Sequence, residues 1–431
     1  MYRHHAIDRK SVVIITVFAM LALVVSGVSA QKTTLTFWHL GPADFWEPLI
    51  RQFEEENPDL QVELADKPAG GTGQQDSLAV AIAGGAPPDV SYMNRFIVAE
   101  WAFNNQLLAL DPFIARDDTM NLEEWIPAAI NDVTWNQQIY ALPFTMGTYG
   151  MIYNKELFGQ AGLDPQTPPR YIDEVDAASQ RITRVGAGDA IEQMGIIPWV
   201  NQGWMNSWGW AFGGTFYNAE TQEITSDDPR NIEALEWLEG YAQRFGFERV
   251  NAWFGSNYSW DRFLANQVGM KVIATTNLDR MFPDHGIDYG IFPFPSPRGV
   301  EQSTWQAGFS YVIPHNVANP EAAWRLLRFV TSAEVQALDA LRGGNFPSVI
   351  EGMRRPEFME DPQVRPWIEM AMNLRVHSLP PHPATGYQWE QVNWARNEAL
   401  LGNMPARQAL EEATRRVRSR LDEILERGSV W

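Results

Sequence analysis

Tryptophan and amide side chains gather in one short segment of this sequence. Four tryptophans stand among three amides and several glycines: Trp199, Trp204, Trp208 and Trp210 beside Asn201, Gln202 and Asn206. An indole ring can cover the flat apolar face of a pyranose, while amides exchange hydrogen bonds with its hydroxyl rim. The same rings could equally pack beneath a loop. We take the segment as a candidate recognition loop for a sugar-like solute and select Trp204 and Trp208 as its contacts.

Nothing in the sequence favours a metal or a phosphate site. His39 has no second histidine at metal-binding spacing, and two prolines separate His377 from His382. Residues 70–73 (Gly-Gly-Thr-Gly) precede a predicted helix but lack the Gly-Lys-Ser/Thr ending of a P-loop, so we expect a plain turn. The chain has no cysteine, which excludes disulfides, thiolate ligands and cysteine nucleophiles. We expect neither a metal nor a cofactor.

Length and charge set the broad class. A chain of 431 residues exceeds the size at which one core stops growing, so we expect two lobes. Hydrophobic residues make up 45% and charged residues 20%, as in ordinary globular proteins. The formal net charge of −20 would repel nucleic acid, so we expect no nucleic-acid partner.

The first thirty residues have the pattern of a secretory signal peptide. A basic start is followed by an apolar run over residues 12–25 and by small residues that end at Ala30. The run is short for the ~20 apolar residues of a membrane span, so a permanent anchor is the less favoured reading. We expect cleavage after Ala30 and, since no cysteine is available for a lipid, a periplasmic protein without a lipid anchor.

Alternating element types predict an α/β fold. Strands are expected over residues 34–38, 60–64 and 89–93, with helices over 44–57, starting at a capping box of Asp44 and Glu47, and over 75–83. This β-α-β-α-β order favours parallel strands, whose ligands gather beyond the C-terminal strand ends. Extended segments at 139–144, 150–154 and 309–314 are expected near crossings between the lobes. In the C-terminal helix, Leu410, Ala413, Val417, Leu421 and Leu425 recur at helical spacing and are expected to be core residues.

An ordered set of short motifs along the chain resembles a known family. The motifs are Leu-Thr-Phe-Trp-His (35–39), Phe-Glu-Glu-Glu-Asn-Pro (53–58), Ala-Gly-Gly-Ala-Pro-Pro-Asp-Val (83–90), Gln-Leu-Leu-Ala-Leu-Asp (106–111), Tyr-Ala-Leu-Pro-Phe (140–144), Tyr-Asn-Lys-Glu-Leu-Phe (153–158), Asn-Pro-Glu-Ala-Ala-Trp (319–324) and Thr-Ser-Ala-Glu (331–334). Together they resemble the extracellular solute-binding proteins of family 1, whose best-known members bind maltose and other sugars.

This resemblance implies the bilobal, type II periplasmic-binding-protein fold. An N-terminal lobe would comprise residues 31–143 plus 309–346, and a C-terminal lobe residues 144–308 plus 347–431. The chain would be a monomer that docks to the permease of an ABC importer. A solute bound between hinged lobes favours the closed form, because only that form contacts it from both sides.

Position at strand ends and the family pattern together add eight candidate ligand contacts. The N-terminal lobe would supply Trp38, His39, Tyr92 and Asn94, and the C-terminal lobe Thr276, Trp305, Tyr387 and Trp389. A lone histidine after a strand is more often a hydrogen-bonded structural residue, which is the competing reading of His39. Relatives often place an aromatic residue where this chain has Thr275 and Thr276, so the sequence departs from the pattern there.

The expected function is capture of a sugar or oligosaccharide for an ABC importer, without chemistry. An exported glycoside hydrolase is an alternative, because aromatic rings and carboxylates also form its subsites; it would need two carboxyl groups about 5–10 Å apart. A binding protein for a phosphorylated polyol or a cationic solute is another. The sequence does not exclude a suitable carboxylate pair.

Overall fold

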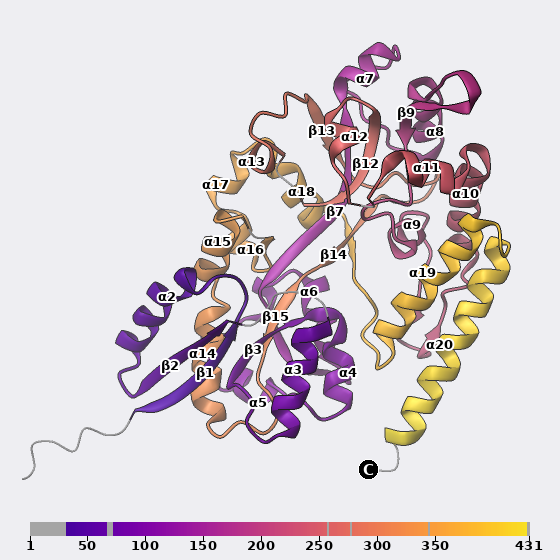
Figure 1. The fold of residues 1–431 in the computed structure, drawn as a ribbon. Coiled ribbons are helices and arrows are strands. Elements are labelled where there is room, and N and C mark those ends of the chain that lie inside the picture. Colours follow the sequence, from indigo (N-terminus) through magenta and orange to yellow (C-terminus); the bar gives the residue numbers. More distant parts are fainter. Residues whose placement is uncertain (1–31, 67–71, 257, 276–277, 344, 429–431) are drawn as a thin grey trace, which may run out of the picture.

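Two β-sheets organise the part of the chain that the structure describes. The computed structural model describes residues 32–66, 72–256, 258–275, 278–343 and 345–428. Within these ranges the strands form a five-stranded sheet and an eight-stranded sheet, each surrounded by helices (Figure 1). The predicted signal peptide, residues 70–71 of the turn predicted over 70–73, and Thr276 lie outside the described residues. Thr72 and Gly73 are not part of a turn but already belong to the helix Thr72–Ala83. Over the described residues, no helix is both long enough and apolar enough to cross a membrane.

The smaller sheet begins at the N-terminal end of the described chain. Its strand order is β2-β1-β3-β15-β6, with bounds β1 (Thr33–His39), β2 (Leu60–Asp66), β3 (Val90–Asn94), β6 (Ala141–Pro143) and β15 (Phe309–Val312). β1 pairs in parallel with both β2 and β3, as the alternating pattern predicts. β15 runs antiparallel to its neighbours β3 and β6.

Short and long helices lie around this sheet. They are η1 (Arg95–Ile97), η2 (Leu122–Glu124), α2 (Ala43–Glu56), α3 (Thr72–Ala83), α4 (Val98–Phe103), α5 (Asp111–Ile114), α6 (Pro127–Asp132) and α14 (Pro320–Val330), with the short hairpin β4 (Thr134–Trp135) and β5 (Gln138–Ile139). The capping box predicted at Asp44 and Glu47 is wrong. Helix α2 begins at Ala43 with Pro42 as its N-cap, so Asp44 already lies inside the first turn, where its charge favours the helix dipole instead.

The larger sheet is built around one long strand, β7 (Thr145–Asn154). The strand order is β17-β14-β7-β12-β9-β8, and β13 and β16 also pair with β7. The bounds are β8 (Arg184–Val185), β9 (Ile191–Ile196), β12 (Val268–Ala274), β13 (Tyr289–Phe292), β14 (Ser303–Ala307), β16 (Phe346–Pro347) and β17 (Arg375–His377). β7 runs antiparallel to β12, β13 and β14.

The remaining helices belong to the part of the chain around the larger sheet. They are α7 (Lys155–Gln160), α8 (Ile172–Ile182), η3 (Ala187–Asp189), α9 (Met205–Ala211), α10 (Pro229–Phe245), α11 (Phe247–Phe254), α12 (Asp261–Leu264), α13 (Leu278–Met281), α15 (Ala333–Leu341), α16 (Ile350–Met353), α17 (Pro356–Met359), α18 (Arg365–Asn373), α19 (Thr385–Leu401) and α20 (Ala406–Gly428), with the hairpin β10 (Tyr217–Asn218) and β11 (Glu223–Ile224). The last two helices lie side by side (Figure 1). Four of the five apolar positions predicted as core in α20 are buried, but Leu425 is 40% exposed.

The chain passes between the two sheets at short, tight connections. β6 ends at Pro143 in the smaller sheet and β7 starts at Thr145 in the larger one; on the way back, β14 ends at Ala307 and β15 starts at Phe309. Gly308 lies between them because a Cβ there would come within 2.0 Å of the Thr145 carbonyl oxygen. The finer lobe boundaries, 31–143 plus 309–346 and 144–308 plus 347–431, stay a prediction.

Candidate functional site

Aromatic rings from both lobes meet around Trp389, the fifth residue of α19. The ring of Phe96, from η1 beside the smaller sheet, stacks on Trp389 with centroids 6.1 Å apart. Trp204 lies 5.3 Å and Trp305 6.0 Å from the same indole. Tyr149, from β7, stacks on Trp305 with centroids 3.7 Å apart. We call these five residues the interlobe aromatic cluster.

Trp305 is the most deeply buried tryptophan of the interlobe aromatic cluster and is 1% exposed. Among the described residues, none accepts a hydrogen bond from its buried Nε1. Burial raises the pKa of the neighbouring Tyr149 hydroxyl, so this phenol stays neutral at ordinary pH. Trp305 therefore combines a stacked ring face with a buried N–H donor for which the described residues supply no acceptor, a costly arrangement unless another group supplies one.

Helix α19 also fixes the loop that carries Trp204. The Asn393 side-chain oxygen accepts a hydrogen bond from the Met205 backbone N–H at 3.1 Å. Arg396 donates to the Gly203 carbonyl at 2.7 Å, and its guanidinium lies 5.3 Å from the Trp204 ring centroid. The Trp204 Nε1 itself donates to Gln202 at 2.8 Å. Helix α19 therefore carries Trp389 and also positions the loop of Trp204, so two of the three tryptophans of the interlobe aromatic cluster depend on this helix.

A buried arginine lies beside the interlobe aromatic cluster at the crossings between the sheets. Arg95 follows β3 and donates to the carbonyl oxygens of Thr145 and Phe309, one on each crossing segment. It also donates to the Gln306 side chain, and its Nε lies 3.3 Å from the Asp132 carboxylate. Burial raises the pKa of Asp132, and the Arg95 guanidinium opposes that rise. Arg95, which directly precedes Phe96 in η1, therefore ties both crossing segments to the start of this helix.

A known family model matches most of the chain. Residues 40–337 match the family model of the bacterial extracellular solute-binding proteins. The chain belongs to this family. This membership confirms the resemblance that the sequence motifs indicate. The members of the family are extracellular solute-binding proteins.

Similar proteins cover most of the length of this solute-binding protein. A maltotriose-binding protein of Pyrococcus abyssi is 24% identical over 85% of this chain and 77% of the relative. An arabinooligosaccharide-binding protein of Bacillus subtilis is 22% identical over 76% of this chain and 77% of the relative. Among solved structures, the sugar-binding protein MalE from Xanthomonas citri matches with a TM-score of 0.76 and 20% identity, over 92% of this chain and 98% of MalE. The predicted bilobal α/β fold is confirmed.

The structure brings together three of the ten site residues predicted for this solute-binding protein. Trp204, Trp305 and Trp389 lie in the interlobe aromatic cluster. Asn94 lies two residues before Phe96 and caps η1, accepting from the Phe96 N–H at 3.0 Å. Thr276 lies outside the described residues.

The other N-terminal-lobe candidates are buried on their strands: Trp38 and His39 at the end of β1, and Tyr92 in the middle of β3. Trp38 is 8% exposed, and His39 and Tyr92 are fully buried. The Nδ1 of His39 lies 3.0 Å from the Gly41 carbonyl oxygen, as in the structural reading of a lone histidine. Tyr92 packs edge-on against Phe309, with centroids 6.0 Å apart. Their contact with a ligand stays a prediction.

Two C-terminal-lobe candidates lie away from the interlobe aromatic cluster. Trp208 is fully buried against Trp237 and Phe294, and its Nε1 donates to the Pro198 carbonyl at 2.7 Å. Tyr387 packs on a small apolar group at the start of α19 and lines a surface cavity beside α20. This arrangement gives Trp208 a packing role in the conformation described.

Sequence reasoning missed Phe96, Tyr149 and Arg95. Phe96 follows the β3 end by two residues, so extending the strand-end rule through the next turn would have found it. Tyr149 is inside β7, which is buried on both faces, and so no alternation of polar and apolar residues marks it. In the described part of the chain, no group of three or more His, Asp or Glu side chains is arranged to hold a metal ion.

Proposed function

We propose that this solute-binding protein captures a sugar or oligosaccharide between its lobes and delivers it, chemically unchanged, to the permease of an ABC importer. The observation that carries the proposal is the interlobe aromatic cluster, in which Trp389 lies against Phe96 from one lobe and Trp204 from the other. Flat rings suit the apolar faces of pyranoses. The names of the relatives from Pyrococcus abyssi and Bacillus subtilis support an oligosaccharide guest.

The proposed contacts come from both lobes. Trp204, Trp305 and Trp389 supply ring faces, and the Trp305 Nε1 would donate to a solute oxygen. Asn94, at the end of β3, would contribute from the opposite lobe, and the buried Trp38 and Tyr92, on the paired strands β1 and β3, are further proposed contacts. A guest that touches both lobes stabilises the closed arrangement, which the permease would recognise. Export by a signal peptide cleaved after Ala30 and release as a periplasmic monomer complete the proposal.

A carbohydrate screen tests this function. The purified protein is heated with members of a library of mono- and oligosaccharides, and a ligand at 100 times its Kd adds roughly 2.7 kcal/mol to the free energy of unfolding. The strongest hits are titrated by calorimetry, and the mixture is then chromatographed for hydrolysis products. Saturable binding with intact sugar is expected. Sugar cleavage would show a glycoside hydrolase, and binding of a phosphorylated polyol or a cation alone would overturn the solute class.

A further inference from the structure

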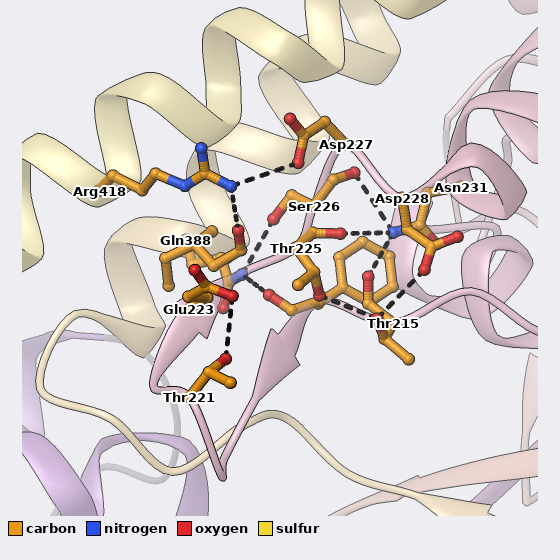
Figure 2. Close-up of polar contacts among 12 residues, drawn as sticks. Thr215, Thr221, Glu223, Thr225, Ser226, Asp227, Asp228, Asn231, Gln388 and Arg418 are labelled. Carbon is orange, nitrogen blue, oxygen red and sulfur yellow. Dashed lines mark hydrogen bonds and ion pairs between the residues drawn. The ribbon is translucent and has the colours of Figure 1, made fainter.

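The first turn of α19 is tied to the β10–β11 hairpin through one buried amide (Figure 2). Gln388 is 2% exposed. Its Nε2 donates to the Phe216 carbonyl at 2.6 Å and to the Ser226 hydroxyl at 2.9 Å, and its Oε1 lies 2.8 Å from the Nε2 of His382. All the polar atoms of this side chain are therefore engaged with residues outside α19.

The contacts of His382 determine which way the Gln388 amide faces. The backbone N–H of Ala384 donates to the Nδ1 of His382 at 3.1 Å, so this nitrogen is an acceptor. The proton of the neutral imidazole then resides on Nε2 and is donated to the Gln388 oxygen. Because the Gln388 Oε1 faces His382, its Nε2 donates one hydrogen to the Phe216 carbonyl oxygen and the other to the Ser226 hydroxyl oxygen. If the amide were flipped, the Gln388 Nε2–H would face the Nε2–H of His382, and neither could accept a hydrogen bond.

The hairpin side of this contact is itself firmly held. Asn231 is fully buried and donates to the Thr215 carbonyl at 2.6 Å and to the Ser226 carbonyl at 3.2 Å. Arg418, from α20, donates to the Ile224 carbonyl at 2.8 Å (Figure 2). Gln388 therefore binds α19 to a hairpin region that α10 and α20 also hold through hydrogen bonds.

The start of α19 lacks an ordinary cap, which makes this support important. Its N-cap residue is Ala384, whose side chain cannot accept a hydrogen bond from the first turn. The first turn is instead linked to the preceding segment: the backbone N–H of His382 donates to the Thr385 hydroxyl at 3.1 Å, and that hydroxyl lies within hydrogen-bond distance of the Pro380 and His382 carbonyl oxygens. Helix ends fray, and Trp389 lies just one turn from this end. The orientation of its ring thus depends on how firmly the first turn is held.

We propose that Gln388, oriented by His382, is a positioning residue for solute recognition: it fixes the first turn of α19 so that the Trp389 ring faces Phe96 and Trp204. Gln388 and Trp389 are neighbours, about 100° apart around the helix, so an amide anchored on one side sets the direction of the indole on another. The link to solute affinity rests on the proposed function. The link to the Trp389 ring does not.

Fluorine NMR of protein labelled with 5-fluorotryptophan tests the positioning directly, without a ligand. The Trp389 resonance is assigned by its loss in Trp389→Phe. Gln388→Met keeps the length and helix propensity of the side chain but removes its hydrogen bonds, and is expected to shift or broaden the Trp389 resonance while leaving that of Trp46, in the other lobe, in place. Gln391→Met, three residues along α19, replaces an amide that accepts from Arg416 and is the matched control.

A binding cycle then tests whether Gln388 acts through Trp389. With maltotriose as the probe, or the strongest carbohydrate of the screen if that differs, Gln388→Met is expected to weaken binding roughly 2- to 10-fold in the wild-type background. In a Trp389→Ala background the same change should have no further effect, because the ring it positions is absent. Equal losses in both backgrounds would show a merely structural role and overturn the proposal.

The outcomes keep the two proposals separate. An unchanged Trp389 resonance in Gln388→Met overturns the positioning role whatever binds. If no carbohydrate binds the wild-type protein, the proposed function fails, while the fluorine spectra still decide the role of Gln388. Should Gln388→Met not yield folded protein, Ser226→Ala removes one acceptor of the same amide as a milder change and is expected to move the Trp389 resonance in the same direction.

Discussion

The rings of Phe96 and Trp389 stack across the boundary between the two lobes, with their planes 30° apart. Phe96 follows a strand of the smaller sheet, but it packs against the apolar core that surrounds the larger sheet. The contact places Trp389 where a guest held between the lobes would meet aromatic surface from either side. It makes Trp389 the residue whose loss tests the proposed site most directly.

Replacing Trp389 by alanine is expected to weaken carbohydrate binding roughly 10-fold or more, because it removes the indole that contacts Phe96, Trp204 and Trp305 in the interlobe aromatic cluster. Calorimetric titration with the strongest carbohydrate of the screen measures the change. Trp394→Ala is the matched control: Trp394 lies on the same helix, but its ring lies 3.8 Å from the Arg416 guanidinium of α20. Equal losses in the two variants would mean that Trp389 does not contact the solute.

Arg95→Met is expected to lower the free energy of unfolding by roughly 3–5 kcal/mol, because it leaves Asp132 buried without its counter-ion and frees the carbonyl groups of both crossing strands. Urea unfolding followed by tryptophan fluorescence measures the change. The control is Arg116→Met, which breaks the exposed pair with Glu321 and is expected to cost under about 1 kcal/mol. A similar small cost for Arg95→Met would contradict the role of this residue at the crossings.

Trp208→Phe is expected to destabilise the protein by roughly 1–3 kcal/mol while leaving solute affinity within about twofold. The change removes the hydrogen bond to the Pro198 carbonyl and opens space between Trp237 and Phe294. Thermal unfolding and calorimetric titration of the same sample separate the two effects. A large loss of affinity without a loss of stability would restore Trp208 as a ligand contact, as its sequence neighbourhood predicts.

The contrast between Trp204 and Trp208 shows where the sequence stops being informative. A spacing of four residues places two side chains on one face of a helix, and so favours a common role. Helix α9 begins at Met205, however, and Trp204 is its N-cap with extended backbone (φ −69°, ψ 159°). Trp204 therefore packs on Trp389, whereas Trp208 is buried in the core. Because the helix starts one residue after Trp204, the rings of Trp204 and Trp208 do not share a helix face. Local sequence patterns do not define a helix start to within one residue.

The fold was more accessible to prediction than the site. Apolar strand patterns near the start of the chain predict β1, β2 and β3. Their parallel pairing follows because a helix connects each strand to the next, and such crossovers favour parallel neighbours. The stacking of Tyr149 on Trp305 joins residues far apart in the sequence and depends on the register of β7 against β14. Such a pairing is a property of the folded molecule, and no local spacing reports it.

Lys271→Met is expected to flatten the dependence of stability on pH. Lys271 is 1% exposed on β12, and its Nζ donates to the Ser259 carbonyl at 2.7 Å and lies 4.5 Å from the Trp260 ring centroid. Burial lowers its pKa to about 7 from 10.5, and Asp261 opposes the change. Between those two values the unfolded chain binds more protons than the folded one, so the free energy of unfolding rises as the pH rises.

The expected rise for the wild-type protein is about 3 kcal/mol between pH 7 and pH 9.5, at about 1.4 kcal/mol per pH unit. Urea unfolding at half-unit steps measures it, and stopping at pH 9.5 stays below the ordinary tyrosine pKa. Lys271→Met should lack this rise and be at least as stable as wild type at pH 7, because no ammonium group then needs to be desolvated. Lys155→Met, at a lysine paired with the exposed Asp288, should keep the wild-type slope. The same slope in Lys271→Met would mean that Lys271 stays charged in the folded protein and that other groups cause the pH dependence.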